Sequence, residues 1–132
     1  MPDERLFLLD THALIWWWLA DPNLSDAART LLERADGSVY VSAVTGLEIA
    51  LKVRARKLSG LAEMLDGFEE ALAGDRLRSL SISHRHAIDA GLLPGTHRDP
   101  FDRLIAAQAL DEDMTVITCD REIARFGCKV LW

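Results

Sequence analysis

Short runs of β-favouring residues alternate with longer helical segments along the whole chain, and this alternation most limits how it can fold. The short runs predict strands at residues 5–9, 38–41, 79–82, 115–118 and 129–131. The longer patterns predict helices at 13–20, 26–35, 44–57, 62–73, 84–92, 100–111 and 121–125. Strands separated by helices are typical of βαβ units. We therefore expect an α/β fold with a central parallel sheet.

Cap residues support several of these helix boundaries. Ser25 has the character of an N-cap, and Asp99 followed by Pro100 is a cap with proline at the first helical position. Gly37 is expected to end the second helix.

The size and composition of the chain suit one compact domain, residues 1–132, with a substantial core. No apolar run approaches the roughly 20 residues that cross a bilayer, and the acidic start does not resemble a signal peptide. Cys119 and Cys128 have neither CxxC spacing nor nearby metal-binding histidines. We expect them to be reduced thiols in or near the core of a cytoplasmic protein.

Two acids follow predicted strands directly. Asp10 comes after an apolar run that ends at residue 9, and Asp120 comes after the run at 116–119. In open parallel sheets, active sites lie at the carboxyl ends of the strands. We therefore expect both acids at the same edge of the sheet.

Two further acids lie on predicted helices. At about 100° per residue, Glu48 lies beside an apolar stripe of Val44, Leu47, Leu51 and Ala55. Asp102 is flanked in the same way by Phe101, Ile105, Ala106 and Ala109. We expect both acids to face inward near the N-terminal parts of their helices, where the helix dipole favours negative charge.

Four carboxylates in one semi-buried pocket would repel one another and lose hydration. A hard divalent cation such as Mg²⁺ or Mn²⁺ relieves this cost, because it prefers oxygen ligands. The acids therefore indicate metal-assisted phosphoryl chemistry. Each also has a simpler interpretation: Asp10 and Asp120 as N-caps, Asp102 as a first-turn acid beside Asp99, and Glu48 as an i,i+4 partner of a lysine.

Other polar residues fit structural roles by default. Asp99 is interpreted first as a cap and second as a peripheral ligand through water. The four histidines, His12, His84, His86 and His97, show no metal-binding spacing, and none pairs with a Ser or Cys nucleophile. His84 and His86 are expected at the surface or the edge of the core.

Two clusters remain candidates for contacts. Lys52, Arg54, Arg56 and Lys57 form a basic run in a chain of net charge −6, and its simplest interpretation is a solvated helix face. Residues 16–18 are three consecutive tryptophans, which cannot all point into one core. We expect two to be buried and one partly exposed, with a dimer or partner contact as the alternative.

Four ordered motifs resemble those of PIN-domain ribonucleases, most closely the toxins of VapBC-type toxin–antitoxin modules. They are residues 8–14 (LLDTHAL), 42–52 (SAVTGLEIALK), 97–109 (HRDPFDRLIAAQA) and 117–120 (ITCD). The resemblance extends from the first predicted strand nearly to the last. One departure is Leu47, where relatives often have an aromatic residue before the helical glutamate.

This resemblance implies a three-layer α/β/α sandwich and an endoribonuclease that needs one or two Mg²⁺ or Mn²⁺ ions. Carried over by motif, the acid cluster is Asp10, Glu48, Asp102 and Asp120, and Thr118 matches a hydroxyl position beside the last acid. The implied partners are an RNA substrate, a cognate antitoxin that inhibits the enzyme, and a second copy in a homodimer. A cytoplasmic location without membrane contact is expected.

The expected reaction is hydrolysis of an RNA phosphodiester without a covalent intermediate, leaving 5′-phosphate and 3′-hydroxyl ends. Asp10 and Asp102 are the expected direct ligands, while Glu48 and Asp120 hold a second ion or activate the attacking water. One alternative is a PIN domain that binds RNA or protein without cleavage. The other is a receiver-like signalling domain, which needs an aspartate at the end of its third strand, where residues 81–84 (SISH) offer none.

Overall fold

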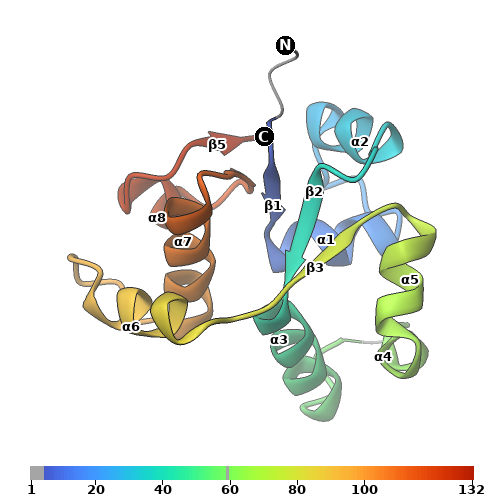
Figure 1. The fold of residues 1–132 in the computed structure, drawn as a ribbon. Helices are drawn as coiled ribbons and strands as arrows, with labels where there is room; N and C mark the ends of the chain where they lie inside the picture. The colour runs from blue at the N-terminus through green and yellow to red at the C-terminus, as the bar shows by residue number, and fades with distance from the viewer. Residues whose placement is uncertain (1–4, 59) are drawn as a thin grey trace.

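A computed structural model describes residues 5–58 and 60–132 of the chain. Its centre is a five-stranded sheet in which all neighbouring strands are parallel, in the order β3-β2-β1-β4-β5 (Figure 1). The strands are β1 (Phe7–Leu9), β2 (Val39–Ser42), β3 (Arg78–Leu80), β4 (Thr115–Ile117) and β5 (Val130–Leu131). The predicted parallel α/β fold is confirmed, and each strand lies within two residues of its predicted bounds.

Helices join the strands and cover both faces of the sheet. They are α1 (Thr11–Trp18), α2 (Asp26–Glu33), α3 (Ala43–Arg54), α4 (Ala62–Asp66), α5 (Phe68–Gly74), α6 (His84–Leu92), α7 (Pro100–Glu112) and α8 (Arg121–Arg125). In Figure 1, α6, α7 and α8 lie on one side of the sheet, and α1, α2, α4 and α5 lie on the other. The three-layer arrangement expected from the resemblance is therefore present.

Side-chain alternation in the central strand divides the core into two parts. Phe7 and Leu9 belong to a cluster that packs under α1, α2 and α5, whereas Leu8 packs against α7 on the opposite face. Leu8 and Leu9 are both fully buried. Because successive side chains point to opposite faces, one apolar strand stabilises both layers.

The order of the strands creates a switch point beside β1. The chain passes from β1 through β2 to β3 in one direction, and then returns to form β4 and β5 on the other side. Ligands bind at such switch points, in the crevice beyond the carboxyl ends of the strands. Here the switch point lies between β1 and β4, which end side by side at Leu9 and Ile117. A receiver-like domain has the different order 2-1-3-4-5.

Two departures from the predicted helices occur near glycines. The predicted helix at 62–73 is broken at Gly67, whose φ and ψ of −116° and 39° separate α4 from α5. The prediction that Gly37 ends the second helix was wrong, because α2 ends at Glu33 with Arg34 as its C-cap. Gly37 instead has a φ of +98° in the turn before β2, a conformation that favours glycine. Ser25 and Asp99 are N-caps, as predicted.

The tryptophans and cysteines differ from their expected positions. All three tryptophans are half-buried against the core of the α1 face, so the expectation that two would be buried and only one partly exposed was wrong. The indole N–H groups of Trp17 and Trp18 both donate to one carboxylate oxygen of Asp75, at 3.1 and 2.9 Å. Cys119 is exposed, not in the core, whereas Cys128 is half-buried.

Within residues 5–58 and 60–132, no helix is both long and apolar enough to cross a membrane.

Candidate metal centre

Asp10 lies at the switch point, between the end of β1 and the start of α1. Its side chain is only 5% exposed. One carboxylate oxygen accepts a hydrogen bond from the backbone N–H of Thr11, and the other accepts one from the hydroxyl of Thr118, both at 2.7 Å. Burial raises the pKa of Asp10, partly opposed by the Thr118 hydrogen bond, and the charge of Glu48 raises it further. The residue therefore serves as an N-cap and also presents a buried carboxylate.

Thr118 connects Asp10 to the acid that follows β4. Its hydroxyl oxygen accepts a hydrogen bond from the backbone N–H of Asp120 at 3.0 Å while its proton goes to Asp10. Asp120 caps α8 by accepting from the N–H of Glu122 at 2.9 Å. The buried threonine thus fixes the separation between the ends of β1 and β4.

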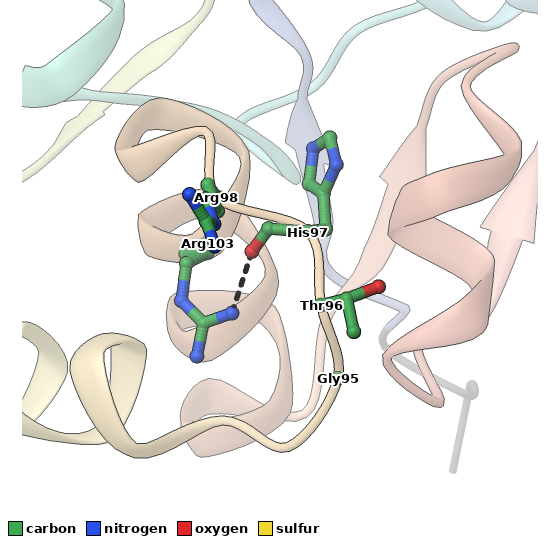
Figure 2. Close-up of a pocket in the computed structure, with 5 residues that line it drawn as sticks. All are labelled: Gly95, Thr96, His97, Arg98 and Arg103. Carbon is green, nitrogen blue, oxygen red and sulfur yellow. Dashed lines mark hydrogen bonds between the residues drawn. The ribbon is translucent and has the colours of Figure 1, made fainter.

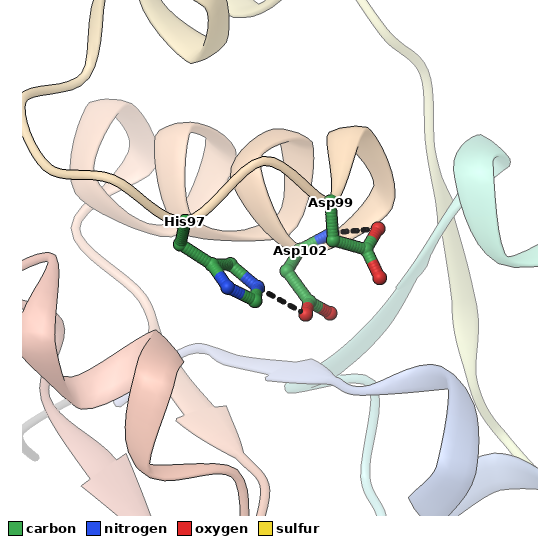
Figure 3. A group of neighbouring side chains, drawn as sticks. All are labelled: His97, Asp99 and Asp102. Atoms are coloured by element: carbon green, nitrogen blue, oxygen red, sulfur yellow. Dashed lines mark hydrogen bonds and ion pairs between the residues drawn. The ribbon is translucent and has the colours of Figure 1, made fainter.

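Asp102 lies in the first turn of α7, where Asp99 caps the helix and Pro100 occupies its first position. Figure 3 shows its carboxylate and the ring of His97 pointing toward each other, with His97 Nε2 2.8 Å from Asp102 Oδ2. Burial raises the pKa of Asp102 to about 6. The hydrogen bond from His97 opposes this shift, while the charges of Asp99, Asp10 and Asp120 increase it.

Asp99 is the N-cap of α7, as predicted, and its carboxylate also lies close to two other possible ligands. One of its carboxylate oxygens accepts from the backbone N–H groups of Phe101 and Asp102, at 2.9 and 3.4 Å. Ligand atoms of His97, Asp99 and Asp102 also lie within 4.8 Å of one another, close enough to share one ion. Asp10 and Asp120 lie outside this closest group, although their charges still act on Asp102.

Glu48 reaches the site by a different route from the one predicted. Leu47 and Leu51 are 53% and 42% exposed, so the expected inward stripe on α3 was wrong at these two positions. The buried face carries Val44, as predicted, together with Thr45 and Ile49, and the Thr45 hydroxyl lies 3.0 Å from that of Thr11. The Glu48 side chain is largely buried, and its charge acts on Asp10.

The position of Glu48 along α3 also differs from the prediction. It is the sixth residue of the helix, in the second turn, where the helix dipole has little effect. Lys52 pairs with it at 3.7 Å, and the Lys52 ammonium lies 3.2 Å from His12 Nε2.

The charges of the four acids act on one another in pairs. Asp102 responds to the charges of Asp10 and Asp120, and Asp10 responds to that of Glu48. Among the described residues, Lys52 is the only lysine or arginine that forms an ion pair with any of the four. Four carboxylates with a single lysine partner offer oxygen ligands and uncompensated negative charge. Such a set suits a hard divalent ion such as Mg²⁺ or Mn²⁺.

His97 is a site residue that the spacing of histidines did not reveal. Its imidazole lies between two acids, with Nε2 at 2.8 Å from Asp102 and Nδ1 at 3.9 Å from Glu122. The hydrogen bond to Asp102 raises the pKa of His97. The available signal was its position two residues before the cap Asp99, since such a residue lies close to the first turn of the helix that follows.

Comparisons with known proteins agree with this geometry. Residues 7–128 match the family model of the PIN domain. Ribonuclease VapC22 of Mycobacterium tuberculosis (strain ATCC 25618 / H37Rv) is 30% identical over 117 residues, covering 88% of each chain.

Two solved structures have similar folds. A structure of FitAB bound to a DNA fragment contains a chain that superposes with a TM-score of 0.70 and 26% identity, covering 96% of this chain and 94% of that one. A DNA-bound VapBC structure from Salmonella typhimurium gives a TM-score of 0.71 and 24% identity, covering 96% and 97%.

Proposed function

Because the chain belongs to the PIN domain family, we propose that it is a divalent-metal-dependent endoribonuclease and the toxin of a type II toxin–antitoxin pair. Its similarity to a protein named ribonuclease VapC22 supports the activity. Its similarity in sequence and fold to a chain of the FitAB complex supports an antitoxin partner. A cytoplasmic location and a homodimer follow from the same proposal.

One observation carries the catalytic part of this proposal. Four carboxylates, on α3 and α7 and in the turns after β1 and β4, are linked in pairs by their charges: Glu48 acts on Asp10, and Asp10 and Asp120 act on Asp102. Burial raises the pKa values of Asp10 and Asp102. N-capping alone does not require the acids to lie close enough for their charges to interact. Because mutual repulsion costs stability in the metal-free protein, the arrangement favours a function that uses a bound cation.

We assign Asp10 and Asp102 as direct ligands. A bound Mg²⁺ or Mn²⁺ supplies charge stabilisation to the phosphate and lowers the pKa of water. Thr118 holds one carboxylate oxygen of Asp10 and thereby fixes its orientation, while His97 does the same for Asp102. Each carboxylate oxygen retains a further lone pair for an ion.

We assign Glu48 and Asp120 to a second ion or to the proton of the attacking water. Lys52 holds Glu48, and the N-cap bond to α8 holds Asp120, so both are oriented before substrate arrives. Water attack in line with the leaving oxygen leaves a 5′-phosphate and a 3′-hydroxyl. The fixed acids would accept the proton that water releases.

Cleavage of RNA by the purified chain tests the proposal. We expect discrete fragments from total cellular RNA with Mg²⁺ or Mn²⁺, none in EDTA, and none from Asp10→Asn, which keeps shape but removes charge. Asp113→Asn is a matched control, because Asp113 is exposed at the C-terminal end of α7.

Two results would reject the assignment: cleavage that persists in EDTA, or full activity in Asp10→Asn. RNA binding without cleavage by folded chain free of antitoxin would instead favour the binding-only alternative. Labelling of the fragment ends tests the predicted 5′-phosphate and 3′-hydroxyl.

A further inference from the structure

A cavity of about 450 Å³ lies beside the metal centre, in the loop between α6 and α7. It is lined by Gly95, Thr96, His97, Arg98 and Arg103 (Figure 2). Two guanidinium groups therefore border a space whose loop continues directly into Asp99 and Asp102. The assignment of the acids leaves this cavity without a role.

Arg103 shapes the cavity and is held in place by main-chain carbonyls. Its guanidinium donates to the carbonyl oxygens of Ala90 and His97, each at 2.8 Å, and to those of Gly91 and Leu93. It also lies 5.5 Å from the centre of the Phe126 ring, within cation–π range. In the part of the chain that the structure describes, no carboxylate pairs with it. Its positive charge is therefore solvated by dipoles but not neutralised by an anion.

Arg98 supplies a second positive charge that is free to bind. It is exposed, and among residues 5–58 and 60–132 its side chain has no hydrogen bond or ion pair. In Figure 2 the side chains of Arg98 and Arg103 extend to one side of the loop, while the His97 ring lies on the other. The loop thus separates a cationic side from the side that faces the acids.

We propose that this cavity is a subsite for a backbone phosphate of single-stranded RNA, next to the phosphate that is cleaved. The proposal rests on the ribonuclease function proposed above. Guanidinium groups bind phosphate oxygens through paired, charge-assisted hydrogen bonds. Arg98 is the exposed binding group, and Arg103 holds the loop and contributes fixed positive charge.

The charge of the protein accounts for the need for such a subsite. The chain has a net charge of −6, and its catalytic edge gathers four interacting acids, so an RNA strand meets repulsion as it approaches. A cationic cavity one loop away from Asp102 attracts the strand at a neighbouring phosphate. An acidic peptide would satisfy the arginines equally, but only a nucleic acid strand carries a second phosphate to the metal centre.

Binding of a short, labelled single-stranded RNA of mixed sequence, followed by fluorescence anisotropy in EDTA, tests the subsite without cleavage. We expect Arg98→Ala to weaken binding about five- to tenfold, and to reduce the slope of log K against log salt by about 0.7, as for one lost phosphate contact. Arg98→Lys should recover part of the affinity, because it keeps the charge but loses the paired geometry.

Two control variants separate binding at this subsite from binding of RNA elsewhere on the surface. Arg34→Ala removes an exposed arginine at the opposite edge of the sheet, after α2. It should change neither the affinity for RNA nor the slope of log K against log salt. Arg54→Ala tests the basic run on α3. If Arg54→Ala reduces the slope of log K against log salt by the full amount expected for Arg98→Ala, and Arg98→Ala itself has no effect, then α3 binds the RNA. That result would overturn the subsite.

Failure of the subsite is distinguishable from failure of the proposed function. With Mg²⁺ present, Arg98→Ala should raise KM more than it lowers kcat. Metal-dependent cleavage with an unchanged KM in Arg98→Ala overturns the subsite but leaves the ribonuclease assignment intact. Weakened RNA binding by Arg98→Ala in a chain that cleaves nothing would support the subsite and reject the nuclease.

Discussion

Replacing Asp102 by asparagine should stabilise the metal-free protein at neutral pH, although it removes a residue of the site. In the folded chain, burial and the charges of Asp99, Asp10 and Asp120 raise the pKa of Asp102 to about 6 from an ordinary 3.8. The folded protein therefore binds this proton more tightly than the unfolded protein does. As the pH rises from about 4 through about 6, Asp102 loses its proton and the free energy of unfolding falls. Asparagine has nearly the same shape and carries no charge, so it avoids this loss.

The size of the effect follows from the shift. Each pH unit by which the folded pKa exceeds the unfolded value is worth about 1.4 kcal/mol, so the full shift corresponds to about 3 kcal/mol at neutral pH. The side chain retains 17% exposure, and solvent and local relaxation reduce the penalty. We therefore expect Asp102→Asn to raise the free energy of unfolding by about 1–2 kcal/mol near pH 7.5 in EDTA.

Urea unfolding at about pH 4 and about pH 7.5 measures this difference. The variant and wild type should have similar stability at the lower pH, because Asp102 is then protonated in the folded protein. Millimolar Mg²⁺ should stabilise the wild type at neutral pH and have much less effect on the variant. A variant that is destabilised equally at both pH values would refute the claim that burial and neighbouring carboxylates destabilise the charged form of Asp102.

Three further predictions concern groups that position the site or hold the helices. Thr118→Val removes the hydroxyl that donates to Asp10 and should weaken the apparent affinity for Mg²⁺ by about 10–100-fold, as measured by metal titration of activity. His86→Ala removes a buried ring that accepts a hydrogen bond from the backbone N–H of Ser83, the N-cap of α6, and lies 3.0 Å from Glu112; it should cost about 2–3 kcal/mol in urea unfolding. Asp75→Ala leaves two indole N–H groups without their acceptor and should cost about 1–2 kcal/mol, with a shift in tryptophan fluorescence.

The strand-end acids could be placed from the sequence because strand ends are tightly constrained. The apolar runs specify parallel strands. Residues that follow closely after the end of such a strand lie at the carboxyl edge of the sheet. Asp10 and Asp120 therefore reach one edge of the sheet whatever the details of the loops. The capping pair Asp99 and Pro100 similarly fixes Asp102 in the first turn of α7.

The orientation of α3 and the loop before α7 could not be predicted in the same way. Hydrophobicity assigned Leu47 and Leu51 to the buried face of α3, but both are exposed, and the buried Thr45 contacts Thr11 of α1 instead. His97 reaches Asp102 because Arg103 binds the carbonyl oxygens of the preceding turn. Contacts between a side chain and main-chain carbonyls leave no periodic pattern in a sequence.

Binding of Mn²⁺, followed by the loss of the free-ion signal in electron paramagnetic resonance, tests the central claim most directly. If the acids form one divalent-metal centre, the wild type should bind one or two ions, and Asp102→Asn should weaken binding at least about tenfold. Asp113→Asn, which changes an exposed acid away from the site, should bind as the wild type does. Equal Mn²⁺ binding by the wild type and Asp102→Asn would contradict the account.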